Sequence, residues 1–160
     1  MLAPVTLSLD AMSGDHGHGV VVDAALATLK KHPALNLILV GDEPTLKATL
    51  AVRKAAPNAR LTLQHASEVV KMSDSPSKAL RGKRDSSMRL AIHLVKQGRA
   101  PAAVSAGNTG ALMAMSPFGM TLLPGNARPA TTSARPHPVR HTPVPDPRPR
   151  LGATSRLGRR

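Results

Sequence analysis

Residues 35–41, with the sequence LNLILVG, are the segment that most restricts how this chain can fold. A nearly continuous apolar run that ends in glycine is typical of a β-strand buried on both faces. Because both faces of such a strand need cover, we expect it in a layered sheet rather than at the surface.

Segments of strand and helix character alternate along the chain around this run. Strand-like apolar patterns occur in 5–11, 60–65 and 102–107. Apolar residues at helical spacing occur in 20–32, 44–56, 86–98 and 108–115. Ser86 or Ser87 is the expected cap of the third helix, and Gly98 its expected end. This alternation indicates parallel βαβ units, so the predicted fold class is α/β with a mainly parallel sheet.

The composition of the chain changes near residue 125. Residues 126–160 contain eight arginines, seven prolines, one acidic residue and no lysine, and they show neither helical nor strand periodicity. Such a segment cannot bury enough apolar surface to offset its ordering entropy. We therefore expect an α/β domain over 1–125, followed by a disordered or polyproline-like tail.

Charge and composition narrow the function classes. The net charge is +13, and more than half of it lies in the tail, so one hypothesis is a basic arm that binds nucleic acid. Against it, Phe118 is the only aromatic residue, which leaves no platform for stacking single-stranded bases. Cysteine is absent, which excludes disulfides and thiolate metal sites. With no transmembrane-length apolar run and no signal-peptide pattern, we expect a cytoplasmic protein.

Polar clusters follow the predicted strands, where parallel α/β sheets bind their ligands. The segment SAGNTGA follows the last of these strands. Gly107 and Gly110 allow backbone amides to approach a ligand, and Asn108 or Thr109 begins a helix. Free amides at a helix start bind phosphate or an oxyanion, but the same pattern also occurs in simple capped turns. The residues alone leave both interpretations open.

The segment SDSPSKALRGKRDSS is basic and follows the third strand. Lys78, Arg81, Lys83 and Arg84 form either a rim for an acidic or phosphorylated partner, or a solvated loop. Lys78 and Arg81 are three residues apart and would share one face of a helix.

The segment LSLDAMSGDHG follows the first strand with acidic and small residues. Asp10 and Asp15 are suited to orienting a nucleophile, binding a cation or holding the loop, and His16 to acid or base chemistry. The spacing of His16 and His18 beside Asp15 indicates a metal site only weakly. We therefore expect neither a metal nor a cofactor.

Four segments together resemble the N-terminal part of the bacterial phosphate acyltransferase family, in the right order and with matching gaps. They are LDAMSGDHG, LVGDE, HASEVVKMSDSPSKALRGKRDSSMRLAIHLVKQGRA and VSAGNTGALMAM. The resemblance covers about residues 5–129. It implies a three-layer α/β/α fold similar to isopropylmalate dehydrogenases and phosphotransacetylases.

The resemblance also implies a function. The family transfers a fatty acyl group from acyl carrier protein to inorganic phosphate, which gives acyl phosphate for phospholipid synthesis. It is a homodimer in the cytoplasm that associates peripherally with the inner face of the membrane, and nucleic acid is not a partner. A phosphotransacetylase-like enzyme acting on an acyl-coenzyme A thioester is the alternative, and competition between the two thioester carriers separates them.

Carried onto this chain, the resemblance assigns two groups of site residues. Those expected at the catalytic centre, with no general base assigned among them, are Asp10, Asp15, His16 and Asn108. Those expected to bind phosphate or the carrier are Gly14, Lys78, Arg81, Lys83, Arg84, Ser105, Gly107, Thr109 and Gly110.

Two features depart from the family pattern. The family usually has two glycines where this chain has Ser13-Gly14, and a serine costs stability there if its φ must be positive. Beyond LPGNARPA the resemblance ends, while family members are far longer. We therefore expect a truncated chain with a frameshifted tail, which lacks the rest of the sheet, most of the dimer interface and the membrane-contacting element. Such a chain belongs to the family without necessarily having its activity.

Overall fold

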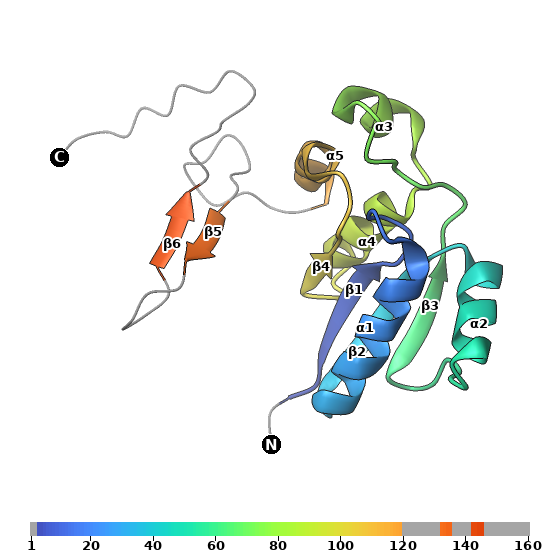
Figure 1. The fold of residues 1–160 in the computed structure, drawn as a ribbon. Helices are drawn as coiled ribbons and strands as arrows, with labels where there is room; N and C mark the ends of the chain where they lie inside the picture. The colour runs from blue at the N-terminus through green and yellow to red at the C-terminus, as the bar shows by residue number, and fades with distance from the viewer. Residues whose placement is uncertain (1–2, 120–131, 136–141, 146–160) are drawn as a thin grey trace.

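The computed structural model describes residues 3–119, 132–135 and 142–145 (Figure 1). Its centre is a four-stranded sheet in the order β3-β2-β1-β4, in which all neighbouring strands are parallel. The strands are β1 Val5–Asp10, β2 Leu35–Gly41, β3 Leu61–His65 and β4 Ala102–Val104. The predicted α/β class with a parallel sheet is confirmed.

Strand β2 is buried as its sequence predicts, from Leu37 through Gly41. Successive side chains of a strand point to opposite faces of the sheet. Accordingly, Leu37 and Leu39 belong to one cluster of core residues, and Ile38 and Val40 belong to another. The two clusters fill the spaces above and below the sheet.

Helices cover both faces of the sheet (Figure 1). The helices on one face are α1 Gly17–Lys31 and α2 Glu43–Val52, and the helix on the other is α4 Ser87–Lys96. Leu29 and Leu46 pack into the first cluster, and Ala91 and Leu94 into the second. The predicted three-layer α/β/α fold is therefore confirmed.

Three short elements gather at the carboxyl ends of the strands (Figure 1). They are α3 Pro76–Gly82, α5 Thr109–Met115 and the 3-10 helix η1 Ser116–Phe118. A third cluster of buried residues joins α3, α4 and α5 through Ala79, Met88 and Ala111. The basic segment, for which a solvated loop was one interpretation, thus contains a helix anchored by a buried alanine.

Two details of the backbone differ from or refine the sequence-based boundaries. Helix α2 ends at Val52 rather than at residue 56, and Lys54 adopts a left-handed conformation with φ of 53° that no helix continues through. Lys54 is the only non-glycine residue with positive φ in the part of the chain that the structure describes. Ser13 therefore has an ordinary backbone, and the positive φ of 111° falls on Gly14.

In the C-terminal region, strands β5 Thr132–Arg135 and β6 Thr142–Pro145 form an antiparallel pair. The domain boundary predicted at residue 125 and most of the tail predicted to be disordered lie outside the described residues. Within 3–119 and the two strands, no helix has the length and apolar character needed to cross a membrane.

Candidate functional site

The fold brings the segments after β1 and β4 together. Strand β1 connects through α1 to β2 on one side, and β4 lies on its other side. Where the strand order reverses in this way, open α/β sheets bind ligands beyond the carboxyl ends of the strands. The carboxyl ends of β1 and β4 are therefore the expected site.

A chain of hydrogen bonds links these two segments. The Asp10 carboxylate is buried at the end of β1, where it accepts bonds from Ser105 Oγ at 2.7 Å and from the Met12 amide at 3.3 Å. The Gly107 amide donates to Ser105 Oγ at 3.1 Å. Three of the predicted site residues, Asp10, Ser105 and Gly107, are thus brought together.

Two glycines allow this close approach. A Cβ on Gly107 would lie 2.6 Å from Ser13 Cβ and 2.9 Å from Met88 Cε, closer than real Cβ atoms pack. A Cβ on Gly14 would lie 3.4 Å from Ala106 Cβ, and the φ of 111° at Gly14 disfavours any side chain. The site therefore requires glycine at both positions because of space at Gly107 and conformation at Gly14.

Asp15 and His16 lie apart from this chain of hydrogen bonds. Both are exposed in the loop before α1, and the His16 side chain does not cap that helix. No hydrogen bond joins either residue to Asp10 within the described residues. No group of three or more His, Cys, Asp or Glu side chains suited to a metal occurs there. The roles predicted for Asp15 and His16 stay predictions.

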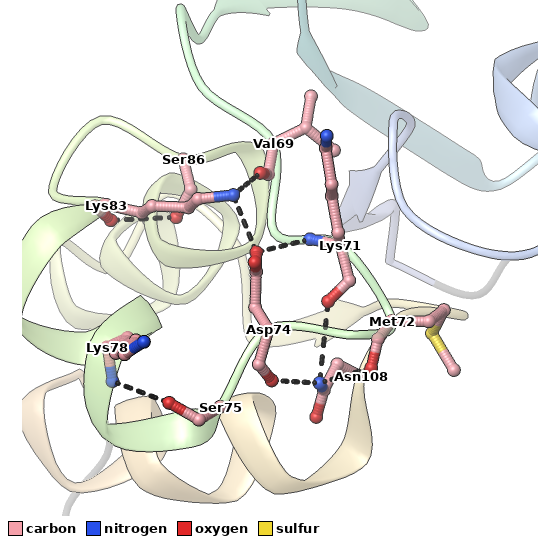
Figure 2. Close-up of polar contacts among 9 residues, drawn as sticks. All are labelled: Val69, Lys71, Met72, Asp74, Ser75, Lys78, Lys83, Ser86 and Asn108. Carbon is pink, nitrogen blue, oxygen red and sulfur yellow. Dashed lines mark hydrogen bonds and ion pairs between the residues drawn. The ribbon is translucent and has the colours of Figure 1, made fainter.

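Asn108 holds two segments together with all of its side-chain polar atoms (Figure 2). Its Oδ1 accepts a bond from the Ala111 amide at 3.0 Å and so caps α5. Its Nδ2 donates to the carbonyls of Met72 at 3.0 Å and Asp74 at 2.9 Å. The turn predicted to bind an anion is thus partly satisfied from within.

Lys83 is also used internally (Figure 2). Its side chain is about a quarter exposed, and its ammonium donates to the Asp74 carboxylate at 2.6 Å and to the Val69 carbonyl. The Lys71 amide donates to the same carboxylate at 2.8 Å. The bond from Lys83, with that from Lys71, holds the pKa of Asp74 below its ordinary value. We call Asp74, Lys83 and Asn108 the clamp.

The other predicted basic residues face solvent. Lys78 and Arg81 on α3, and Arg84 just after it, are exposed, and their charged groups have no partner within the described part of the chain. Thr109 and Gly110 are exposed at the start of α5, where Gly110 allows Pro76 to approach: a Cβ would lie 2.9 Å from Pro76 Cγ. Lys83 therefore differs from Lys78, Arg81 and Arg84, because its charge is paired within the described part of the chain and theirs are not.

Sequence analysis missed two buried hydroxyl groups. Ser13 Oγ and Ser87 Oγ are buried and have no hydrogen-bond partner among the residues that the structure describes. The only sequence signal for Ser87 was its place in a pair of possible caps. Ser86 occupies the cap position, but its hydroxyl donates to the Lys83 carbonyl at 3.0 Å.

A shallow groove lies elsewhere, between α1 and α2. Its volume is about 510 Å³, and its lining includes His18, Thr45 and Arg53. None of the residues that line it belongs to the predicted site.

Comparisons with known proteins agree on one family. The family model described as fatty acid synthesis protein matches residues 5–144, which extends past residue 129, where we expected the resemblance to end. A phosphate acyltransferase of Methylococcus capsulatus is 57% identical over 141 residues, which are 88% of this chain and 42% of that protein. A phosphate acyltransferase of Halorhodospira halophila is 52% identical over 85% of this chain and 40% of its own length. One of Nitrosococcus oceani is 54% identical over 82% and 39%. The chain spans about two fifths of these curated relatives.

Proposed function

Since the chain belongs to the fatty acid synthesis protein family, we propose that it is the N-terminal part of an enzyme that transfers a fatty acyl group from acyl carrier protein to inorganic phosphate. The observation that carries this proposal is its identity of 57% to a phosphate acyltransferase over 88% of the chain. The same similarity favours this function over a nucleic-acid-binding arm.

In this reaction, a phosphate oxygen attacks the thioester carbonyl carbon, the C–S bond breaks, and the thiol leaves with a proton. The protein must hold phosphate in line with the carbonyl and stabilise the charge that develops on its oxygen. The linked groups of Asp10, Ser105 and Gly107 support this role because they join a buried carboxylate to a hydroxyl and an amide at the carboxyl ends of β1 and β4. We assign Asp10 to orienting Ser105.

The exposed cations support an acidic macromolecular donor. Lys78, Arg81 and Arg84 have no partner among the described residues, so they are available to an acidic carrier protein or to the phosphate of its prosthetic arm. A coenzyme A thioester remains the alternative donor. Homodimer formation, a cytoplasmic location and peripheral membrane association are part of the proposal for the longer protein.

The test measures thiol release from acyl carrier protein thioester with and without inorganic phosphate. It uses the chain itself and a chimera in which residues 5–119 replace the matching part of the Methylococcus capsulatus relative. We expect phosphate-dependent thiol release and an acyl phosphate product from the chimera. A folded chimera that releases thiol equally without phosphate, or none at all, contradicts the proposal.

Two controls sharpen this test. Asp10→Asn in the chimera removes the carboxylate that receives the Ser105 bond and should lower the rate. Substituting acyl-coenzyme A for the carrier thioester identifies the donor, because a charge-reversed Arg81→Glu variant should impair only the reaction with the acidic carrier protein.

A further inference from the structure

The first turn of α4 has unused hydrogen-bond donors. The Ser87 amide donates to the Glu68 carbonyl at 3.0 Å, and the Leu90 amide donates to the Ser86 carbonyl at 2.9 Å. Met88 and Arg89 lie between these two residues in the sequence, and their amides have no acceptor among the residues that the structure describes. Ser86 has the backbone of a cap, but its hydroxyl is turned to Lys83. The usual intramolecular cap is therefore missing.

Two buried hydroxyls belong to segments at the carboxyl edge of the sheet. Ser87 is the first residue of α4 and is 0% exposed, and Ser13 is 2% exposed. Neither Oγ has a partner within 3–119 or the two C-terminal strands. Buried hydroxyls are nearly always hydrogen-bonded, so two orphans at the same edge of the sheet point to a ligand there. We call Ser13, Ser87 and the amides of Met88 and Arg89 the serine site.

Gly107 connects the two sides of the serine site. The position of its missing Cβ is 3.0 Å from Ser13 Oγ and 2.9 Å from Met88 Cε. The loop after β1, the loop after β4 and the Met88 side chain from the first turn of α4 therefore meet at this glycine. All three lie at the carboxyl edge, because α4 begins after β3 and ends before β4.

The register of α4 on β1 indicates that Asp10 lies beneath the first turn of α4. Nearer the start of β1, Ser8 Oγ donates to the Ala91 carbonyl at 2.8 Å. This bond fixes the position of α4 along β1. Asp10 is two residues further along the same face of β1, and Ser87 is one turn further back along α4. The step along β1 is about 6.6 Å and the step along α4 is about 5.4 Å. Both run toward the carboxyl edge of the sheet, because α4 is antiparallel to β1, and so Asp10 comes to lie beneath the start of the helix.

We propose that the serine site binds inorganic phosphate, with its oxygens accepting from Ser87, Ser13 and the free α4 amides, and its P–OH group donating to Asp10. The identity of this anion rests on the proposed function. A protonated phosphate has the hydrogen that a buried carboxylate can accept, whereas sulfate and phosphodiesters have none. Asp10 therefore selects phosphate over both.

The test is calorimetric titration of the full 160-residue chain with inorganic phosphate, sulfate and dimethyl phosphate. We expect phosphate to bind at least tenfold more tightly than the other two. Ser87→Ala should raise the Kd for phosphate about tenfold, and Ser13→Ala about threefold, through loss of bonds to a charged ligand. The matched control is Ser77→Ala, which removes an exposed hydroxyl on α3 and should leave the Kd unchanged.

Asp10→Asn keeps a polar group of the same size and should reduce the preference for phosphate over sulfate. The proposal is overturned if both serine variants leave the Kd within twofold, or if sulfate or dimethyl phosphate binds as tightly as phosphate. Melting curves of each variant show whether the fold is retained. If acyl phosphate forms but the two serine variants bind phosphate as tightly as the parent chain, the serine site is refuted and the proposed function is not. Phosphate binding that the variants weaken, without acyl phosphate formation, refutes the function alone.

Discussion

The clamp and the serine site lie at the same edge of the sheet and use the same kinds of polar group, but only the clamp is complete. In the clamp, Lys83 and Asp74 pair with each other, and all three side chains bond the backbone of residues 69–74. In the serine site, two buried hydroxyls have no partner in the described part of the chain. Asn108 and Lys83 have partners within the fold, and the site roles predicted for them stay predictions. The two serine hydroxyls have no such partner among the described residues, and they are the groups that we propose for a ligand.

The comparison has a simple energetic consequence. Removing a polar group that is bonded leaves its partners unsatisfied, which is costly. Removing one that is already unpartnered relieves a cost. The two regions should therefore respond to substitution with opposite signs of stability change.

Asn108→Ala should have the largest effect. It removes the α5 cap, worth about 1 kcal/mol, and two bonds to carbonyls worth about 1 kcal/mol each, so unfolding should be easier by about 2–3 kcal/mol. Urea unfolding measures this change. Asn108→Ser keeps a good cap without reaching the carbonyls and should lose only part of it. A loss below about 0.5 kcal/mol for Asn108→Ala would show that the clamp contributes little.

Gly107→Ala should have the second largest effect on the free energy of unfolding. Its methyl group would overlap Ser13 Cβ, so the loops must shift, at a cost of about 2 kcal/mol. The same shift should weaken phosphate binding. Gly82→Ala is the matched control because a Cβ there meets nothing within 4 Å, and it should leave stability unchanged or slightly raised. Equal effects of the two variants in urea unfolding would mean that the close packing at Gly107 is not required.

Ser87→Ala and its neighbour Ser86→Ala should change stability in opposite directions when phosphate is absent. The first removes an unpartnered buried hydroxyl and should stabilise the chain by up to about 1 kcal/mol. The second removes the bond to the Lys83 carbonyl and should destabilise it by about 1 kcal/mol. Thermal unfolding in a phosphate-free buffer compares them. Destabilisation by both variants would argue that Ser87 is bonded within the protein.

The smallest effect is the pH dependence of the clamp. The folded pKa of Asp74 is lowered by Lys83, so its contribution to stability is present above the unfolded value of about 3.9 and is lost as pH falls through the folded pKa. The stability difference between the parent chain and Asp74→Asn should be constant above about pH 5 and shrink below about pH 4. Urea unfolding from pH 7 to 3 follows it. A difference that is constant down to pH 3 would mean that the Lys83 pair does not stabilise the fold.

Much of the fold could be predicted from local pattern. The apolar run of β2 predicts a strand with both faces buried. Together with the alternation of strands and helices, it predicts that the polar segments lie at the carboxyl edge of the sheet. The pattern could not separate Lys83 from Lys78, because only tertiary packing brings Asp74 and the Val69 carbonyl to one of them. Similarly, the cap identity of Asn108 is local, but its bonds to carbonyls 34 and 36 residues away are not.

The serine pair shows the same limit at closer range. Capping preference selects Ser86 or Ser87 equally well, and Ser86 does occupy the cap position. The Ser86 hydroxyl donates to the Lys83 carbonyl instead of accepting a bond from an amide of α4. Sequence reasoning has no signal for such a competing acceptor, and so the open donors of α4 were not foreseen.

The most direct test of the serine site is a crystal structure of the chain soaked in arsenate, which has the shape and protonation of phosphate and scatters X-rays anomalously. The account predicts an anomalous peak at the start of α4, within hydrogen-bonding distance of Ser87 Oγ and of the Met88 or Arg89 amide. A peak among Lys78, Arg81 and Arg84, with none at α4, would contradict it and would assign the anion to the exposed cations instead.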